Sequence, residues 1–174
     1  GIKYPDKSTP GIDYIISDYS YLKENKKKIK AYIITHGHDD QLGAIAYMAK
    51  DCPAPIYCTD VTKMLIESFL SHVNSGANLT FNVVKPTSDE IIANHKIHFF
   101  ATCHNMPRSF GVAIETSAGN IIYTGDFIIE NNSFKNFSYD STAVGRIAEK
   151  PTLLLMCEST YATRPGYTTP NHRL

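Results

Sequence analysis

The chain has 174 residues and a mass of 19.4 kDa, and 43% of its residues are hydrophobic, 11% aromatic and 20% charged. These values are typical of a globular domain with its own core, and they exclude a disordered or collagen-like chain. Seventeen basic residues balance seventeen acidic ones, so the surface is not uniformly basic and any contact with nucleic acid must be local.

The first half of the chain alternates between strand and helix patterns. Short apolar runs bounded by polar or proline residues predict strands, and longer amphipathic segments predict helices. Strands are predicted over residues 31–35, 55–59 and 79–85, and helices over 42–50 and 61–73. Asp60 is expected to cap the second of these helices. The lysine-rich segment 23–30 reads as a solvated helix end or, alternatively, as a contact for phosphates.

The second half contains a run of strands and one further helix. Strands are predicted over 96–102, 110–116, 120–124 and 152–157, and a helix over 142–149. Ser117-Ala-Gly-Asn between two of the strands is a hairpin signal. Strands that first alternate with helices and then form a meander predict an α/β layered domain with a mixed sheet.

The cysteines and the apolar runs indicate the compartment. Cys52, Cys58, Cys103 and Cys157 form no C-x-x-C pair, and we expect them to be reduced, although four cysteines formally allow two disulfides. No apolar run approaches the roughly 20 residues that a membrane span requires. The first residues carry no apolar stretch of the kind found in signal peptides. The prediction is a cytoplasmic protein without a membrane contact.

A cluster of metal-ligand types follows the first predicted strand. Residues 35–43 read T-H-G-H-D-D-Q-L-G and place His36, His38 and Asp40 between a strand and a helix. Loops at the carboxyl ends of strands are where open α/β sheets hold ligands. Imidazoles with a carboxylate suit zinc or manganese. The alternative makes Asp40 a helix N-cap and the histidines incidental loop residues.

Two later predicted strands are also followed by residues of a type that binds metal ions. His104 follows the predicted strand 96–102, and Asp126 lies in a Gly-Asp turn after the strand 120–124. The sequence therefore predicts that these side chains join the first cluster in one metal site. The remaining histidines lack such a context and are interpreted as surface or packed residues; they are His72, His95, His98 and His172.

Five blocks in order resemble the ribonuclease J family of the metallo-β-lactamase superfamily, most closely its second, degenerate paralogue. They are residues 10–22 (P-G-I-D-Y-I-I-S-D-Y-S-Y-L), 35–44 (T-H-G-H-D-D-Q-L-G-A), 103–116 (C-H-N-M-P-R-S-F-G-V-A-I-E-T), 121–127 (I-I-Y-T-G-D-F) and 153–168 (L-L-L-M-C-E-S-T-Y-A-T-R-P-G-Y-T). The resemblance implies an α/β fold, the αββα sandwich of that superfamily. Residues 1–174 would be one partial metallo-β-lactamase domain, without the opening strands and the β-CASP insertion.

The resemblance also implies a site. His36, His38 and His104 match ligands of one metal, Asp126 matches a carboxylate that bridges two metals, and Asp40 matches a ligand of the second. Asp40, His104 and Asp126 are thereby the implied catalytic residues. The implied cofactor is zinc, with manganese or magnesium as alternatives. The implied substrate is RNA, cut internally or from its 5′ end.

The chain departs from the family pattern at two informative positions. Gln41 stands where the signature has a histidine, and Arg108 stands where the family has an aspartate. A carboxamide is a poorer ligand than an imidazole for a zinc-like ion, so one tight metal ion is expected. Three functions remain open: a ribonuclease, a catalytically weak subunit that binds RNA, an active paralogue or itself, and another hydrolase of the same fold.

Overall fold

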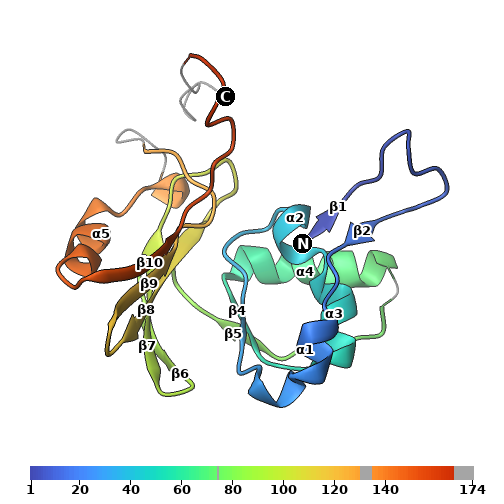
Figure 1. The fold of residues 1–174 in the computed structure, drawn as a ribbon, viewed down its shortest axis with the longest axis horizontal. Coiled ribbons are helices and arrows are strands. Elements are labelled where there is room, and N and C mark those ends of the chain that lie inside the picture. The colour runs from blue at the N-terminus through green and yellow to red at the C-terminus, as the bar shows by residue number, and fades with distance from the viewer. Residues whose placement is uncertain (74, 130–134, 167–174) are drawn as a thin grey trace. The chain divides into compact units, whose positions relative to one another are not determined.

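The computed structural model describes residues 1–73, 75–129 and 135–166, which fall into two compact units, 1–84 and 85 onward (Figure 1). Each unit has its own sheet and its own buried cluster. No helix in the described ranges is both long and apolar enough to cross a membrane. His172 and the last two residues of the block 153–168 lie outside the described residues.

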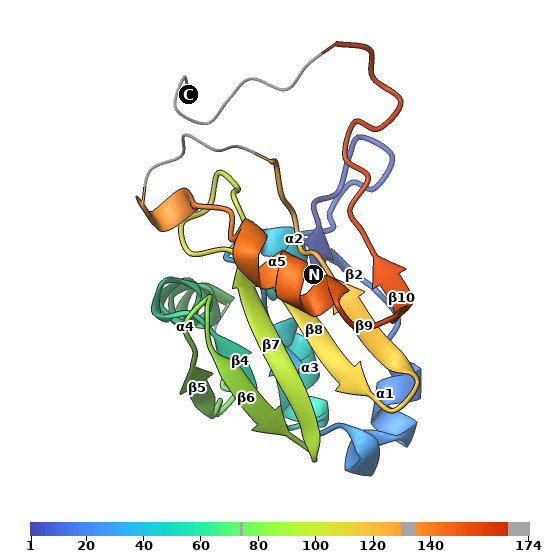
Figure 2. The ribbon, with the colours of Figure 1, turned by 90° about the vertical axis from the view of Figure 1, so that its left-hand side faces the viewer.

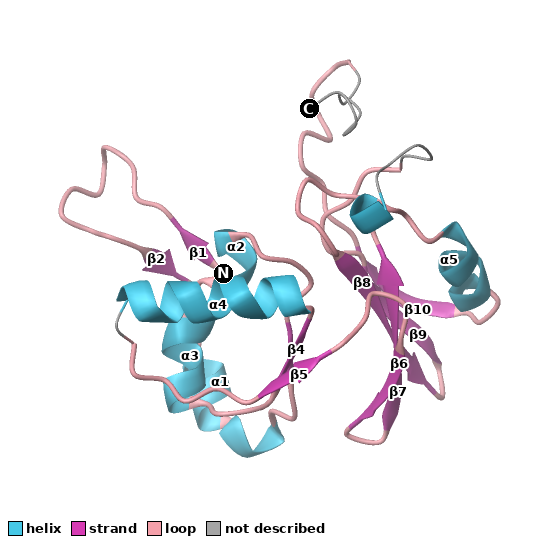
Figure 3. Cartoon of the chain, turned by 180° about the vertical axis from the view of Figure 1, so that it is seen from behind, coloured by secondary structure: helices cyan, strands magenta, loops and turns pink. Residues whose placement is uncertain are grey.

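The first unit is built on a parallel three-stranded sheet. The strands lie in the order β3 (Tyr32–Ile33), β4 (Ile56–Cys58) and β5 (Phe81–Val83). The helices α3 (Ile45–Asp51) and α4 (Asp60–Val73) lie on one side of these strands, as Figures 1 and 3 show. Because parallel strands need a crossover, a helix follows each of the first two strands, and the predicted alternation of strand and helix is confirmed.

Burial of one helix face against this sheet forms the core of the first unit. Ile56, Cys58 and Ile66 are completely buried, and Leu42 and Ile45 pack into the same cluster. The predicted cap of α4 is wrong by one residue. Asp60 is the first helical residue, and the side chain of Thr59 before it accepts a hydrogen bond from the Thr62 amide at 3.4 Å.

The predicted helix over 42–50 corresponds to α3, which begins three residues later than predicted. A short helix α2 (Asp39–Leu42) ends at Gly43, and α3 begins at Ile45. The two-residue strands β1 (Ile2–Lys3) and β2 (Ile15–Ile16) pair antiparallel, and Ile2 packs against Gly43. A Cβ at Gly43 would lie 2.6 Å from Ile2 Cγ1, so the glycine is required for β1 to approach α2.

The lysine-rich segment forms α1 (Ser20–Glu24) and the 3-10 turn η1 (Lys26–Lys28). Its lysines are exposed, and Lys23 Nζ lies 2.7 Å from the Asp51 carboxylate. This agrees with a solvated helix end. Contact with phosphates stays an alternative.

The second unit is a five-stranded mixed sheet. Its strands are β6 (Asp89–Ile92), β7 (His95–Ala101), β8 (Phe110–Thr116), β9 (Gly119–Tyr123) and β10 (Thr152–Met156), and they lie in the order β10-β9-β8-β7-β6. The four strands β6 to β9 form an antiparallel meander, and β10 pairs parallel to β9. Four of these strands and the turn at Ser117 were predicted from the sequence.

Strand β6 was not predicted. Its acidic start, Asp89-Glu90, is untypical of strands. The strand exists because Ala93 and Asn94 adopt φ values of 51° and 66°, which close a tight two-residue hairpin and pair Ile92 with His95. The turn chemistry therefore outweighs the composition of the strand.

The helix α5 (Ser141–Ala148) connects β9 to β10 and lies across one face of the sheet (Figure 2). Asp140 caps it by accepting a hydrogen bond from the Ala143 amide at 2.9 Å. Ala143 and Ile147 on its buried side pack on Phe100 and Ala113 of the sheet. The short turn η2 (Lys135–Phe137) precedes the helix, and all four cysteines of the chain are free thiols.

Candidate metal centre

Two histidines lie together in the first unit, directly after β3. The strand ends at Ile33, and the buried residues Thr35 and His36 follow it two and three residues later. The Thr35 hydroxyl lies 3.0 Å from His36 Nδ1, a contact that orients the imidazole. The rings of His36 and His38 meet edge to face with centroids 4.9 Å apart. The sequence thus places two imidazoles side by side at the carboxyl end of a parallel strand.

A hydrogen bond holds the loop that carries these histidines. The Tyr4 hydroxyl, from the segment after β1, donates to Asp39 Oδ2 at 2.5 Å. This bond to the carboxylate raises the pKa of Tyr4 to about 12, so the phenol stays protonated and remains a donor at physiological pH. Asp39 directly follows His38, and the contact therefore ties the histidine loop to the β1–β2 ribbon. The sequence analysis did not single out either residue.

Asp40 and Gln41 both lie in α2. His38, not Asp40, is the N-cap residue of this helix, and no side chain caps it by a hydrogen bond. The alternative interpretation of Asp40 as an N-cap is therefore wrong. Asp40 is exposed in the first helical turn, and its predicted role as a metal ligand stays a prediction.

A histidine and an aspartate lie together in the second unit. β7 and β9 are both antiparallel to β8, so their carboxyl ends meet at the same edge of the sheet. His104 follows the first of these strands and Asp126 follows the second. His104 Nε2 lies 3.8 Å from Asp126 Oδ2, and both side chains are largely buried. The pairing of these two loops was predicted from their position at strand ends.

The backbone of the second unit fixes this pair. Cys103 and Ile128 form an isolated antiparallel bridge, with the Ile128 amide donating to the Cys103 carbonyl at 2.8 Å. Gly125, with a φ of 59°, makes the turn that aims Asp126. Arg108 also has a positive φ, 58°, and its amide donates to the Asn136 carbonyl at 2.7 Å.

The donor atoms of the two pairs are of the kinds that bind transition metals. The first unit contributes two imidazoles, those of His36 and His38, and the second unit contributes the imidazole of His104 and the carboxylate of Asp126. Nitrogen and oxygen donors of this kind suit zinc and related divalent ions. They indicate a metal-ion binding site.

Comparisons with known proteins agree with this chemistry. The family model of the metallo-beta-lactamase superfamily matches residues 8–153. The chain is 36% identical over 172 residues to Ribonuclease J 2 of Staphylococcus aureus strain MRSA252 and 32% identical to Ribonuclease J 2 of Staphylococcus epidermidis. These matches cover 99% of this chain and 31% of each relative, so the chain spans about a third of their length.

Solved structures share the fold at low sequence identity. A protein of unknown function from Enterococcus faecalis V583 matches with a TM-score of 0.57 and 18% identity, covering 80% of this chain and 33% of that one. The Flv1 flavodiiron core from Synechocystis matches with a TM-score of 0.52 and 12% identity, covering 79% of this chain and 42% of that one. At such identities the likeness shows the fold alone.

Proposed function

The chain belongs to the metallo-beta-lactamase superfamily, and on that basis we propose that it is part of a metal-dependent ribonuclease of the ribonuclease J type. The observation that carries the proposal is the similarity to Ribonuclease J 2 along nearly the whole chain. RNA is the proposed substrate, and the cut is either internal or at the 5′ end. The free cysteines are in keeping with a cytoplasmic protein.

The two donor pairs are proposed to hold one divalent ion. His36 and His38 supply two imidazoles, and His104 with Asp126 supplies a third imidazole and a carboxylate. Zinc is the proposed ion, with manganese or magnesium as alternatives. When bound, such an ion lowers the pKa of a water molecule and stabilises negative charge on the phosphoryl oxygens.

The side chains of the chain itself have separate proposed roles. Thr35 orients the imidazole of His36, and Asp39 holds the loop that carries His38 through its hydrogen bond from Tyr4. His104 and Asp126, which lie 3.8 Å apart, are the ligands proposed from the second unit, and the Asp126 carboxylate would also accept a hydrogen bond from the reacting water. Asp40 is the carboxylate proposed for a second metal position. That position has no imidazole from Gln41, so a second ion is expected to bind weakly.

A second candidate function follows from the same substitution. A chain with Gln41 in the signature and Arg108 in the next block is also suited to serve as a catalytically weak subunit that binds RNA or an active paralogue. The remote alternative is another hydrolase of this fold, and the similarity to Ribonuclease J 2 disfavours it.

Removal of the metal is the direct test of the proposed activity. The full-length protein, incubated with a 5′-labelled RNA, is expected to lose at least about 99% of its hydrolysis after chelation, because the metal supplies the nucleophile and the charge stabilisation. Readdition of zinc or manganese is expected to restore it. Elemental analysis of the same sample should give one tightly bound ion per chain. RNA hydrolysis that persists in the metal-free protein would contradict the proposal.

We further propose that the protein associates with a second copy or with an active paralogue through β10. In the described part of the sheet this strand lies at the edge, and Leu153 to Met156 are 43–57% exposed. An apolar edge strand readily pairs with another chain. A second apolar run, Tyr32 to Ile34, is not part of this surface, because Tyr32 and Ile34 are partly buried against the core of the first unit.

Light scattering on the full-length protein checks the association. Leu153→Lys is expected to convert the associated species to monomer, because a lysine on an edge strand opposes pairing. Met64→Lys places the same change on the exposed side of α4, where Met64 is 69% exposed, and should leave the mass unchanged. A monomeric wild-type protein at all concentrations, with no mass gain when the paralogue is added, would rule out this association.

A further inference from the structure

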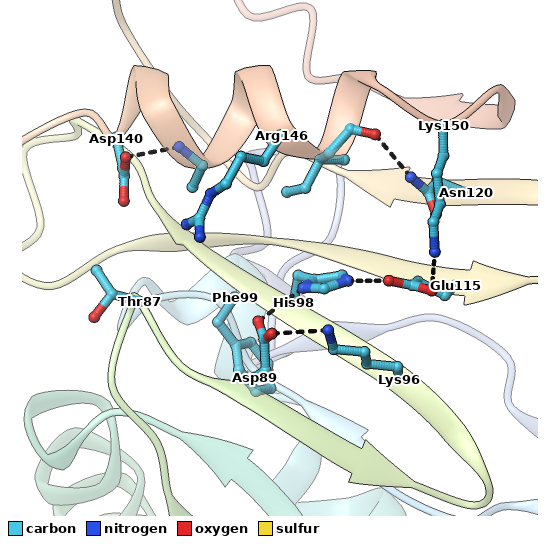
Figure 4. A pocket seen from close by; sticks show the side chains of 12 residues that line it. Thr87, Asp89, Lys96, His98, Phe99, Glu115, Asn120, Asp140, Arg146 and Lys150 are labelled. Carbon is cyan, nitrogen blue, oxygen red and sulfur yellow. Dashed lines mark hydrogen bonds and ion pairs between the residues drawn. The ribbon is translucent and has the colours of Figure 1, made fainter.

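A charged cavity lies in the second unit, away from the metal donors of that unit. Its volume is about 200 Å³, and it opens between α5 and the strands β6 to β9 (Figure 4). All of its lining residues belong to the second unit, and neither His104 nor Asp126 is among them. What the cavity binds is therefore a separate question from the proposed ribonuclease activity.

The cavity is polar because one face of the sheet changes character along its length. Phe100 and Ala113 lie under α5 and are apolar, whereas His98 and Lys96 come two and four residues earlier on the same face of β7. The strand register places Asp89 of β6 opposite His98. Charged side chains thus occupy a sheet face whose other end is covered by a helix.

An unbroken chain of ion pairs lines this end of the sheet. His98 lies between two carboxylates, with Nδ1 2.7 Å from Asp89 Oδ1 and Nε2 2.6 Å from Glu115 Oε1. A carboxylate oxygen faces each ring nitrogen, so the two contacts hold the imidazole between the two strands. Lys96 contacts the other oxygen of Asp89 at 3.2 Å, and Lys150 contacts the other oxygen of Glu115.

The two carboxylates in this network of ion pairs, Asp89 and Glu115, are ionised, and all their oxygens have partners. The hydrogen bonds from Lys150 and His98 lower the pKa of Glu115 to about 2. Burial raises the pKa of Asp89, but the hydrogen bonds from His98 and Lys96 outweigh it, and the pKa lies below its ordinary value. Each of the four carboxylate oxygens of Asp89 and Glu115 already has a nitrogen partner. These acids therefore have no oxygen to spare for a metal ion.

The unused hydrogen-bonding capacity of the cavity consists mostly of donors. The Arg146 guanidinium points from α5 towards the sheet, and among the described residues it has no hydrogen bond or ion pair. Lys96 and Lys150 each use one donor of three on a carboxylate. The basic side chains Lys96, Arg146 and Lys150 line the cavity together with His98 and the carboxylates of Asp89, Glu115 and Asp140. The guanidinium and the remaining ammonium donors favour an anion as the ligand.

The cavity also has one buried hydrogen-bond acceptor, the side-chain oxygen of Asn120. Asn120 is only 2% exposed, and its Nδ2 donates to the Ile147 carbonyl at 2.9 Å. This bond orients the amide and leaves Oδ1 without a partner in the described structure. A buried unsatisfied oxygen is costly, so a ligand that also donates one hydrogen bond would be favoured.

We propose that this cavity binds a small oxyanion of the hydrogen-phosphate type, either inorganic phosphate or the phosphate group of a phosphomonoester. Its oxygens accept from Arg146 and the lysines, and its hydroxyl donates to Asn120. Guanidinium groups bind phosphate through paired, charge-assisted hydrogen bonds. The volume is below the range of about 300–1,000 Å³ that drug-sized ligands occupy, which favours a small ligand over a polymer.

Calorimetric titration of the metal-stripped full-length protein with inorganic phosphate tests the proposal. Removal of the metal prevents phosphate from binding at the metal centre. We expect saturable binding of one phosphate, and about fivefold weaker binding of sulfate, which has the same charge but no proton to donate at neutral pH. Ribose 5-phosphate in a parallel titration distinguishes the two sources: tighter binding than phosphate assigns a phosphomonoester, and equal or weaker binding assigns inorganic phosphate.

Two exposed basic residues provide the matched variants. Arg146→Gln is expected to weaken phosphate binding by about tenfold or more, since it removes charged hydrogen bonds. Lys85→Gln removes one positive charge outside the cavity and should change the affinity by less than about twofold. Thermal unfolding of both variants verifies that they are folded, and Lys150→Gln repeats the test at the second donor.

Three results would overturn the proposal. The first is the lack of saturable phosphate binding by the wild-type protein. The second is an unchanged affinity in both folded variants, Arg146→Gln and Lys150→Gln. The third is displacement of phosphate by an oligoribonucleotide without terminal phosphates, which would assign the cavity to the phosphodiester chain of RNA. None of these results bears on the metal-dependent hydrolysis test, so the two proposals fail independently.

Discussion

Asp126→Asn in the full-length protein is expected to reduce RNA hydrolysis by at least about 100-fold and to lower the content of bound metal. The proposed role of Asp126 is that of the only carboxylate in the four-residue donor group. An asparagine of the same size offers a neutral oxygen, which is a weaker ligand and a weaker acceptor for the reacting water. Rates with 5′-labelled RNA and elemental analysis of the purified variant measure the two effects.

Asp13→Asn is the matched control for this variant. It makes the same chemical change at an exposed position of the first unit, outside the donor group. We expect its rate and its metal content to equal those of the wild type within about twofold. If Asp126→Asn retains both hydrolysis and metal while it unfolds at the wild-type temperature, the proposed ligand set is wrong.

Gln41→His is expected to have the opposite effect, an increase in hydrolysis of about tenfold or more in the full-length protein. The substitution restores the imidazole that the superfamily signature carries at this position of α2. Next to Asp40, this imidazole provides a nitrogen ligand for a second ion, and two metal ions stabilise both the attacking and the leaving oxygen. Elemental analysis should show a rise from one ion to two.

Gln41→Asn controls for any change at this position, because it keeps an amide and adds no nitrogen ligand. Its activity should stay at the wild-type level. A Gln41→His variant that binds two ions but cuts RNA no faster would show that another residue limits catalysis. Arg108 is the first to examine, since it stands where the family has an aspartate and its backbone has a positive φ of 58°. In that outcome the second candidate function, a weak partner subunit, is favoured.

Local sequence patterns determined much of the fold. The strands and helices with strong apolar periodicity, such as β8 and α4, lie within a residue or two of their predicted bounds. The pairing of His104 with Asp126 also followed from the sequence, because both residues come directly after strands that run in the same direction in one sheet. The turn at Gly125 and Asp126 could also be predicted, because a glycine directly precedes a residue that can bind a metal.

The helix termini and the turn-dependent elements were less accurately predicted. Asp60 is of a residue type that often caps helices, but the hydroxyl of Thr59 accepts the capping hydrogen bond of α4. The helix predicted over 42–50 begins only at Ile45, because a turn at Gly43 and Ala44 separates α3 from α2. Strand β6 depends on a hairpin turn with two positive φ values, which its acidic sequence does not indicate. Each difference arises from a contact or a backbone angle that apolar periodicity does not encode.

The sequence by itself determined the donor types, their places after strands and the departure at Gln41, because these depend on residue identity and local order. Only the tertiary structure decided which side chains share a charge network. His98 was interpreted as an ordinary surface or packed histidine, yet strand register places it between the carboxylates of Asp89 and Glu115. Such a pairing joins residues from three strands, and their proximity exists only once the sheet has formed.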